Sequence, residues 1–201
     1  MIKRALISVS DKAGLEELVK ALNEYGVEIV SSGGTAKRIK ELGYTKLTEV
    51  SDYTGHPESP GGLLKTLHPR VHGGLLLSKS VPEHKEYMEQ HGIKPFEMVV
   101  VNLYPFEATV AKGADLHTAA ENIDIGGPTM IRSAAKAALL YSSVAIITDP
   151  SQYTDVIITL KANKGDVPAT MKRELAEKAY ARTSAYDAAI TSYLGKERKK
   201  K

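Results

Sequence analysis

The segment from Glu121 to Thr129 combines a carboxylate with backbone that can approach a ligand closely. Two glycines and a proline follow Asp124, and the proline suits the first turn of a helix predicted over residues 128–138. N–H groups at a helix start, together with the helix dipole, attract anions. Lys136 follows on the same predicted helix. The segment predicts polar chemistry on a small molecule, although Asp124 could simply cap the helix and Lys136 could be a solvated surface residue.

A second candidate is the turn Ser32-Gly33-Gly34-Thr35, which lies between a predicted strand and a predicted helix. Glycines expose backbone N–H donors, hydroxyls add further donors, and the following helix directs its positive end at an anion. The pattern suits a phosphate cradle, and the nearby Lys12 supports this interpretation. Alternatively, a glycine turn capped by Thr35 could start a helix without binding any phosphate.

Lysine and histidine residues gather in the next polar loop. A metal site there would use His68 and His72, with His56 or Glu58 as a third ligand, but no firm ligand set is present. The alternative for His68 is a packed side chain bonded to backbone. Lys65 could neutralise substrate charge or polarise a carbonyl beside a phosphate site.

The elements that must position these residues alternate between strand and helix patterns. Compact apolar runs predict strands at residues 3–9, 27–30, 46–50, 98–103 and 144–147. Apolar spacing and capping residues predict helices at residues 15–25, 82–90, 106–110, 116–121, 128–138 and 150–162, and a further basic helix follows the turn at Thr35 and ends at Gly43. This order predicts an α/β fold, a three-layer α/β/α domain with a mainly parallel sheet and additional C-terminal helices.

In such a sheet, ligands bind beyond the carboxyl ends of the strands. Ser10, Asp11 and Lys12 follow the first predicted strand, and Asn102 and Tyr104 follow the central one. We therefore expect these residues to meet the two candidate turns at one end of the sheet. Tyr104 could instead be only a packing aromatic at a strand end.

Two other regions carry expectations about structure. Residues 51–74 lack periodicity and predict a functional loop, and Leu75-Leu76-Leu77 then predicts a short strand. A long C-terminal helix is predicted from its apolar stripe, which consists of Met171, Leu175, Ala179, Thr183, Tyr186, Ile190 and Leu194.

The composition of the 201 residues excludes several classes of protein. Cysteine is absent, so disulfides and thiolate metal sites are excluded, as expected for a cytoplasmic protein. No apolar run approaches the roughly 20 residues of a membrane helix. The formal charge of +3 comes from residues 196–201, which hold five cations and one anion and predict a frayed basic tail. The remaining domain, residues 1–195, is nearly neutral, which argues against a nucleic-acid groove.

The chain resembles the IMP cyclohydrolase portion, which is N-terminal, of the bifunctional enzymes AICAR transformylase/IMP cyclohydrolase. Matching motifs occur in order along residues 4–194. They are ALISVSDK at residues 5–12, SGGTAK at 32–37, KTLHP at 65–69, VHGG at 71–74, NLYPF at 102–106, ENIDIGGP at 121–128 and YDAAI at 186–190.

The resemblance implies a methylglyoxal-synthase-like fold and a cyclohydrolase, formally a hydrolase run in the ring-closing direction, that converts FAICAR into IMP and water. It implies no cofactor and no metal. It further implies a homodimer. Because the given sequence lacks the transformylase part, the chain is either a stand-alone cyclohydrolase, with a separate AICAR transformylase as a partner, or an excised domain. A non-catalytic nucleotide-sensing module with the same fold is the alternative function, and methylglyoxal synthase is a second enzyme alternative.

The resemblance also implies roles for individual residues. Catalytic roles fall to Lys136, Asp124, Tyr104 and Lys65. Substrate binding falls to Ser10, Asp11, Lys12, Ser32, Gly33, Gly34, Thr35, Thr66, Asn102, Ile125, Gly126 and Gly127. Leu63 departs from the pattern, because the family usually has arginine there, and leucine cannot replace a guanidinium on phosphate.

Overall fold

A five-stranded parallel sheet forms the centre of the chain, in a computed structural model that describes residues 1–198. The strand order is β3-β2-β1-β4-β5. The strands are β1 (Arg4–Val9), β2 (Glu28–Ser31), β3 (Leu47–Glu49), β4 (Met98–Asn102) and β5 (Ala145–Ile147). The parallel pairing confirms the predicted sheet.

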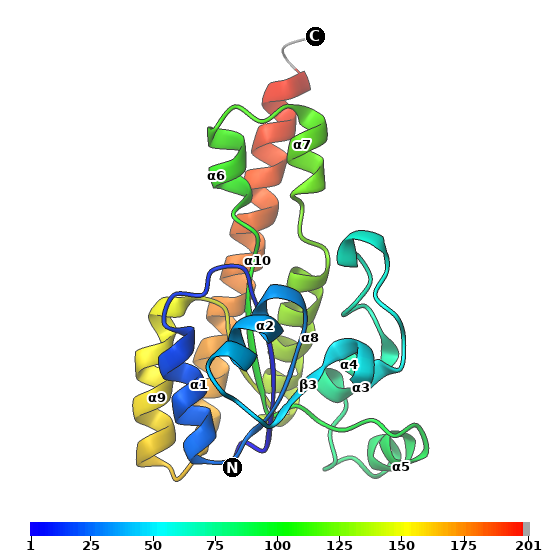
Figure 1. Cartoon of the computed structure of the whole chain (residues 1–201), viewed down its shortest axis with the longest axis vertical. Coiled ribbons are helices and arrows are strands. Elements are labelled where there is room, and N and C mark those ends of the chain that lie inside the picture. Colours follow the sequence, from blue (N-terminus) through cyan, green and yellow to red (C-terminus); the bar gives the residue numbers. More distant parts are fainter. Residues whose placement is uncertain (199–201) are drawn as a thin grey trace.

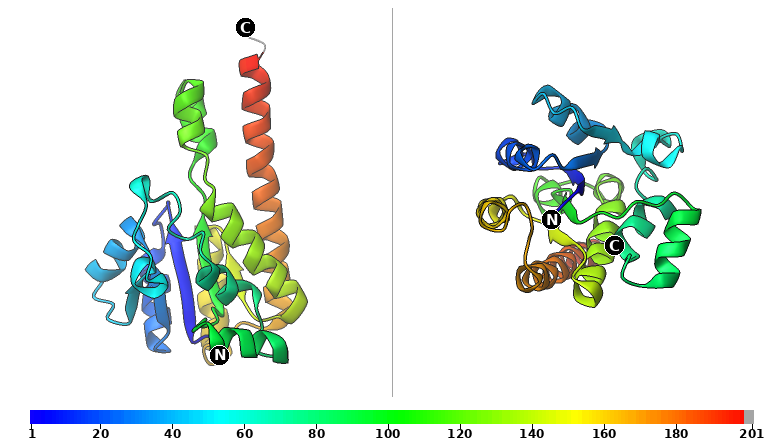
Figure 2. Two further views of the ribbon diagram at one scale, coloured as in Figure 1. Left: turned by 90° about the vertical axis from the view of Figure 1, so that its right-hand side faces the viewer. Right: turned by 90° about the horizontal axis from the view of Figure 1, so that it is seen from below.

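Helices surround this sheet on both faces (Figures 1 and 2). They are α1 (Leu15–Glu24), α2 (Gly33–Glu41), α3 (Val50–Thr54), α4 (Pro69–Leu76), α5 (Pro82–Gln90), α6 (Phe106–Ala111), α7 (Leu116–Glu121), α8 (Gly126–Tyr141), α9 (Tyr153–Ala162) and α10 (Ala169–Arg198). Short 3₁₀ turns lie at Pro60–Gly62 and Pro150–Gln152.

Side chains alternate between two hydrophobic cores along the central strands. Leu6 of β1 and Val99 of β4 belong to the core beneath α4, α8 and α10, whereas Ile7 and Val100 belong to the core beneath α1, α2 and α9. Because successive residues of a strand point to opposite faces, a strand that is apolar throughout must be covered on both sides. The two cores confirm the predicted three-layer α/β/α architecture.

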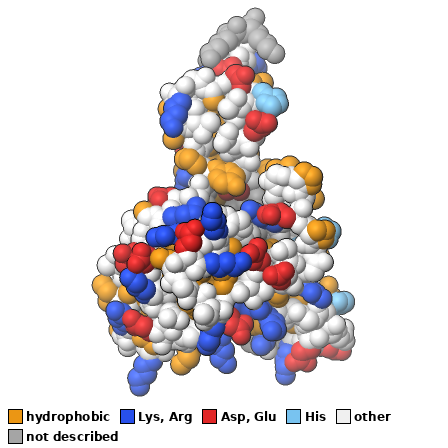
Figure 3. All heavy atoms as spheres, viewed as in Figure 1, with side chains coloured by type: hydrophobic (Ala, Val, Ile, Leu, Met, Phe, Trp, Pro, Cys, Tyr) orange, Lys and Arg blue, Asp and Glu red, His pale blue; other side chains and the backbone are white. Residues whose placement is uncertain are grey.

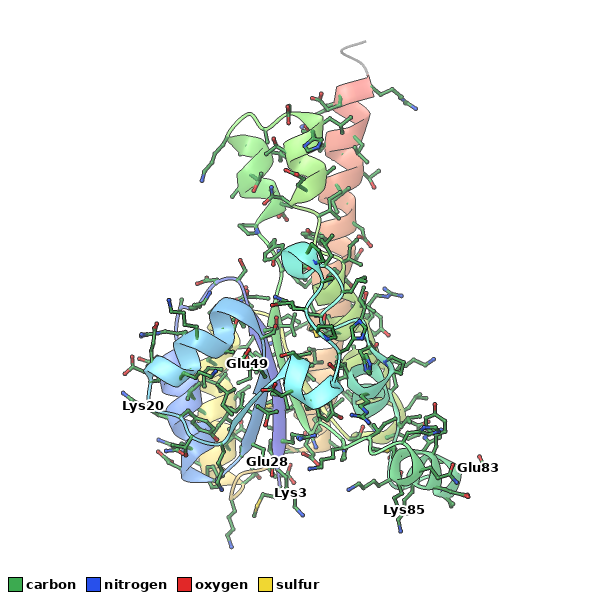
Figure 4. All side chains as sticks on the ribbon, turned by 45° about the vertical axis from the view of Figure 1, so that its right-hand side comes forward. Lys3, Lys20, Glu28, Glu49, Glu83 and Lys85 are labelled. Carbon is green, nitrogen blue, oxygen red and sulfur yellow. The ribbon has the colours of Figure 1, made fainter. Side chains whose placement is uncertain are left out.

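The strand register brings several polar residues to one end of the sheet. Val9 lies opposite Asn102, and Ile7 lies opposite Ser31, so β1, β2 and β4 end close together. Glu49, at the end of β3, lies at this end as well, whereas Lys3 and Glu28 lie at the other (Figure 4). The carboxyl ends of the strands therefore converge where the sequence predicts ligand binding.

A helical projection, made of α6, α7 and the C-terminal part of α10, rises beyond this end of the sheet (Figures 1 and 2). Phe106 of α6 is buried there and contacts two tyrosine rings of α10, Tyr186 and Tyr193, edge to face. The segment between α7 and α8 leads from the projection back to the sheet.

The predicted short strand at Leu75-Leu76-Leu77 is wrong, because Leu75 and Leu76 belong to α4. Pro69 starts this helix, and His68 caps it by accepting the Arg70 N–H through Nδ1 at 3.1 Å. This contact confirms the interpretation of His68 as a histidine bonded to backbone. Residues 51–74, predicted to lack regular structure, also contain α3 and a 3₁₀ turn.

The C-terminal helix differs from its prediction at its far end. Leu194, assigned to the apolar stripe, is 45% exposed, and Tyr193 contacts Phe106 instead. The helix continues through Arg198, so residues 196–198 of the predicted frayed tail are helical, and the other three tail residues lie outside the described residues.

Candidate active site

A cavity of about 450 Å³ opens at the carboxyl ends of β1, β2 and β4. Thirteen of the predicted site residues line it: Ser10, Lys12, Ser32, Gly34, Thr35, Lys65, Thr66, Asn102, Tyr104, Asp124, Ile125, Gly126 and Gly127. Lys and Arg side chains gather nearby, around the loop after β1 and around α2 (Figure 3). The structure thus brings together residues from five separate segments of the sequence.

One wall of the cavity is the turn between β2 and α2. Ser32 precedes the helix in an extended conformation, and its Oγ is buried and makes no hydrogen bond to any residue between 1 and 198. The first N–H groups of a helix have no intrahelical partner and form a natural anion site. A Cβ atom at Gly34 would lie 3.9 Å from Lys12 Nζ, and one at Gly33 would lie 3.2 Å from Lys65 Nζ. Two ammonium groups therefore stand beside this turn.

Two residues that were predicted to bind the ligand, Thr35 and Asn102, use their side chains in hydrogen bonds within the protein. The Thr35 hydroxyl donates to the Val9 carbonyl at 3.0 Å and accepts the Val9 N–H at 3.1 Å, which ties α2 to β1. Asn102 accepts the N–H groups of Ser10 and Asp11 at 2.6 and 2.9 Å and donates to the Asp11 carbonyl at 2.8 Å. Both side chains shape the cavity wall, and their capacity to bind a ligand directly is reduced.

Asp124 forms the opposite wall of the cavity. Its Oδ1 accepts the Gly127 N–H at 2.8 Å, and its Oδ2 accepts the Tyr104 N–H at 3.4 Å. Burial raises the pKa of Asp124, and these two N–H groups and the Lys65 ammonium partly offset that rise. Asp124 is half-buried, and a partly desolvated carboxylate with a raised pKa is suited to accept a proton.

Two glycines allow the backbone to approach at this wall, as the sequence predicts. A Cβ atom at Gly126 would lie 2.6 Å from Thr66 Oγ1, and one at Gly127 would lie 2.5 Å from Asp124 Oδ2. Any larger residue would displace Thr66 or Asp124, because such distances are far inside van der Waals contact.

Apolar side chains surround the mouth of the cavity. Leu63 is 72% exposed, Ile125 is 56% exposed and Tyr104 is 47% exposed. Lys65 lies deeper and is 3.6 Å from Glu58 Oε1. The positively charged groups among the lining residues, within the described part of the chain, are Lys12 and Lys65.

Three predicted site residues lie outside the lining of the cavity. Gly33 lies behind it, in a side pocket that shares Ser32 and Lys65 with it. Asp11 is exposed, and its carboxylate accepts the Ala13 N–H at 2.9 Å. Lys136 is exposed on α8, six residues beyond Met130, which lines the cavity. At about 100° per residue, Lys136 lies on a different face of the helix from Met130.

Sequence reasoning missed several lining residues. Glu121 at the end of α7, Met130 and the glycine pair at residues 61–62 all line the cavity. Met130 follows Gly126 by four residues, so helical periodicity could have found it. Glu121 begins the ENIDIGGP motif, but its spacing does not indicate that it lines the cavity. Among residues 1–198, no group of three or more His, Asp or Glu side chains is arranged to hold a metal ion.

Comparison with known proteins defines the class of this domain. Residues 14–129 match the family described as MGS-like domain, so the chain belongs to that family. Residues 134–201 match the family described as AICARFT/IMPCHase bienzyme. These two matches confirm the resemblance that the motifs carry.

Particular relatives are similar over nearly the whole chain. Bifunctional purine biosynthesis protein PurH from Magnetococcus marinus is 55% identical over 96% of this chain, and PurH from Bradyrhizobium diazoefficiens is 52% identical over 98%. The chain spans only 36% of the length of either protein. A crystal structure of ForH has a TM-score of 0.84 and 31% identity, covering 96% of this chain and 97% of that one.

In the described part of the chain, no helix is both long and apolar enough to cross a membrane.

Proposed function

We propose that the chain is an IMP cyclohydrolase, which closes the second ring of FAICAR to give IMP and water. The observation that carries this proposal is a cavity in which the first turn of α2, with Lys12 and Lys65 beside it, faces the half-buried carboxylate of Asp124, whose pKa is raised. Its volume of about 450 Å³ falls within the usual range for small-molecule sites. The names of the relatives support a place in purine biosynthesis, and the family that residues 134–201 match carries IMPCHase in its description.

The turn before α2 would bind the phosphate of the nucleotide. Backbone N–H groups of the first helical turn, the Ser32 hydroxyl and the ammonium groups of Lys12 and Lys65 would supply the donors. The heterocycle would then extend towards Asp124 and the apolar mouth. Binding at both ends would fold the substrate into attack geometry, which is a major source of rate in an intramolecular reaction.

Ring closure requires one bond to form and water to leave. The carboxamide nitrogen of FAICAR attacks its own formyl carbon, and the formyl oxygen becomes a hydroxyl. This oxygen leaves as water, with one proton from the carboxamide and one from the formamide nitrogen. In the proposal, Asp124 takes the proton from the attacking carboxamide, while Lys65 or the Tyr104 hydroxyl donates to the oxygen.

Lys136 has no role in this scheme, because it lies on another face of α8 and does not line the cavity. The resemblance implies that Lys136 is a proton donor or acceptor, and in our proposal Lys65 or Tyr104 acts as the donor instead. The Lys65 ammonium contributes to the electrostatic environment of Asp124. We also propose a cytoplasmic homodimer, which rests on the resemblance alone. We further propose that AICAR transformylase supplies FAICAR, because the similar proteins carry the name bifunctional.

The test is to incubate the purified chain with FAICAR and to follow IMP by chromatography, with IMP binding measured by calorimetry. We expect catalysed conversion and IMP binding. Binding of IMP without turnover would contradict the proposal and favour the nucleotide-sensing module, and absence of both would remove the nucleotide assignment altogether.

A further inference from the structure

The loop that carries Asp124 joins two parts of the molecule, the helical projection and α8 (Figure 1). At its start, the N–H groups of Asn122 and Ile123 bond to the last turn of α7. The Asp124 N–H instead donates to the hydroxyl of Tyr186, 62 residues away on α10, at 2.8 Å. A long-range side-chain contact thus determines where the backbone of Asp124 lies.

Tyr186 is well suited to hold this loop in place. Its side chain is almost completely buried, with 1% exposure, and its ring packs edge to face on Phe106 at 6.1 Å. A tyrosine hydroxyl can accept and donate at once. Besides accepting the Asp124 N–H, it donates to the carbonyl of Asn122 at 3.4 Å. One hydroxyl therefore bridges two peptide groups of the same loop.

We propose that Tyr186 is a positioning residue, which fixes the main chain at Asp124 so that its carboxylate meets the N–H groups of Gly127 and Tyr104. Tyr186 itself does not line the cavity among the described residues, so it acts through Asp124. The inference rests on the proposed function, because it gives a supporting residue to the proton acceptor of that reaction.

The charged groups near Asp124 and Tyr186 determine how removal of the Tyr186 hydroxyl should change the pKa of Asp124. The charged and titratable groups around this pair are Lys65 beside Asp124, and Glu107 and Arg182 beside Tyr186. None of them is changed by Tyr186→Phe. Without the hydroxyl, the loop relaxes and the N–H donors of the carboxylate weaken. Because those donors stabilise the charged form, the pKa of Asp124 rises further in the variant.

The chain offers a closely matched control on the same helix. Tyr193 also packs edge to face on Phe106, at 5.9 Å, and its hydroxyl donates to the carbonyl of Ala114 at 3.0 Å. Ala114 belongs to the connection between α6 and α7, away from the residues that line the cavity. Tyr193→Phe removes a tyrosine hydroxyl from the projection without touching the loop of Asp124.

The experiment compares Tyr186→Phe with Tyr193→Phe in kcat, KM for FAICAR, thermal stability and the acid limb of the pH profile. For Tyr186→Phe we expect kcat to fall about ten-fold, as for loss of one hydrogen bond, with KM changed less than about two-fold. The acid limb should move to higher pH. For Tyr193→Phe we expect a similar loss of thermal stability with kcat within about two-fold of the parent chain. Equal kcat losses in both variants, or an unchanged kcat in Tyr186→Phe, would overturn the inference.

A second measurement needs no substrate. Carbon-13 NMR of labelled aspartate carboxyl groups reports the titration of Asp124 directly, with assignment by Asp124→Asn. The inference predicts a higher pKa for Asp124 in Tyr186→Phe than in the parent chain, and an unchanged one in Tyr193→Phe. Failure of the parent chain to convert FAICAR refutes the proposed function alone, whereas an unchanged titration in Tyr186→Phe refutes the positioning role alone.

Discussion

Substitution of Gly127 by alanine tests whether the close packing around Asp124 matters for catalysis. The added methyl group would lie 2.5 Å from Asp124 Oδ2 and 2.7 Å from Leu103 Cδ2. These distances fall about 1 Å short of ordinary van der Waals contact. The Asp124 carboxylate must therefore move, since the Leu103 side chain is buried and is confined by the core.

The size of the effect follows from this displacement. Misplacing a reacting group by about 1 Å can cost about a hundred-fold in rate. Loss of a hydrogen bond to a charged group costs about 1.5–3 kcal/mol, which corresponds to roughly 10- to 150-fold. We therefore expect kcat for FAICAR cyclisation to fall between about ten- and a hundred-fold in Gly127→Ala. Crowding should also destabilise the fold by about 1–3 kcal/mol.

Gly74→Ala is a control that separates the stability loss caused by steric crowding from a specific loss of kcat. A Cβ atom at Gly74 would lie 2.6 Å from the Lys94 carbonyl oxygen and 2.9 Å from Phe96, so this helical glycine is equally crowded but lies outside the cavity lining. The assay measures initial rates of IMP formation alongside urea unfolding for both variants. Comparable stability losses with a large kcat loss only in Gly127→Ala support the reasoning. Gly127→Ala turnover within about two-fold of the parent chain, or equal kcat losses in both variants, would refute it.

Further variants test other parts of the account. Leu63→Arg places a guanidinium at the cavity mouth, so KM for FAICAR should fall about ten-fold in steady-state assays. An unchanged KM would show that Lys12 and Lys65 already supply enough positive charge to bind the phosphate. Lys136→Ala should keep turnover within about two-fold, since this lysine lies outside the cavity, and a large loss would restore the role implied by the resemblance. The pKa of Asp124 is raised in the folded chain, so the folded state binds more protons than the unfolded state, and the free energy of unfolding should fall as pH rises through that pKa. Urea titrations of the parent chain and of Asp124→Asn at several pH values measure this effect, and Asp124→Asn should lack it.

The sheet and most helices were predictable because their signals are local. Apolar runs such as Met98–Asn102 must be covered on both faces, and the alternation with amphipathic segments then determines a parallel sheet. The helix α4 was missed because its two glycines weaken the helical pattern. The structure gives a reason for Gly74, which allows α4 to approach the Lys94 carbonyl closely, and such a contact depends on a distant part of the chain.

The sequence predicts which residues form the site better than it predicts the contacts that those residues make. The ends of parallel strands converge by topology, so Ser10, Ser32 and Asn102 were expected together. That the Asn102 amide is used to hold the backbone of Ser10 and Asp11 depends on side-chain geometry across 91 to 92 residues. The stripe on α10 included Tyr186 as a core residue, but no pattern in the sequence indicates that its hydroxyl reaches Asp124.

The most direct test of the central claim compares Asp124→Asn with Asp115→Asn in FAICAR cyclisation. Both aspartates accept a backbone N–H near a helix start, but Asp124 lines the cavity and Asp115 lies in the projection, where it accepts the Thr118 N–H at 2.8 Å. We predict that Asp124→Asn loses at least about a hundred-fold in kcat while still binding IMP, and that Asp115→Asn keeps kcat within about two-fold. Near-normal IMP formation by folded Asp124→Asn would contradict the account.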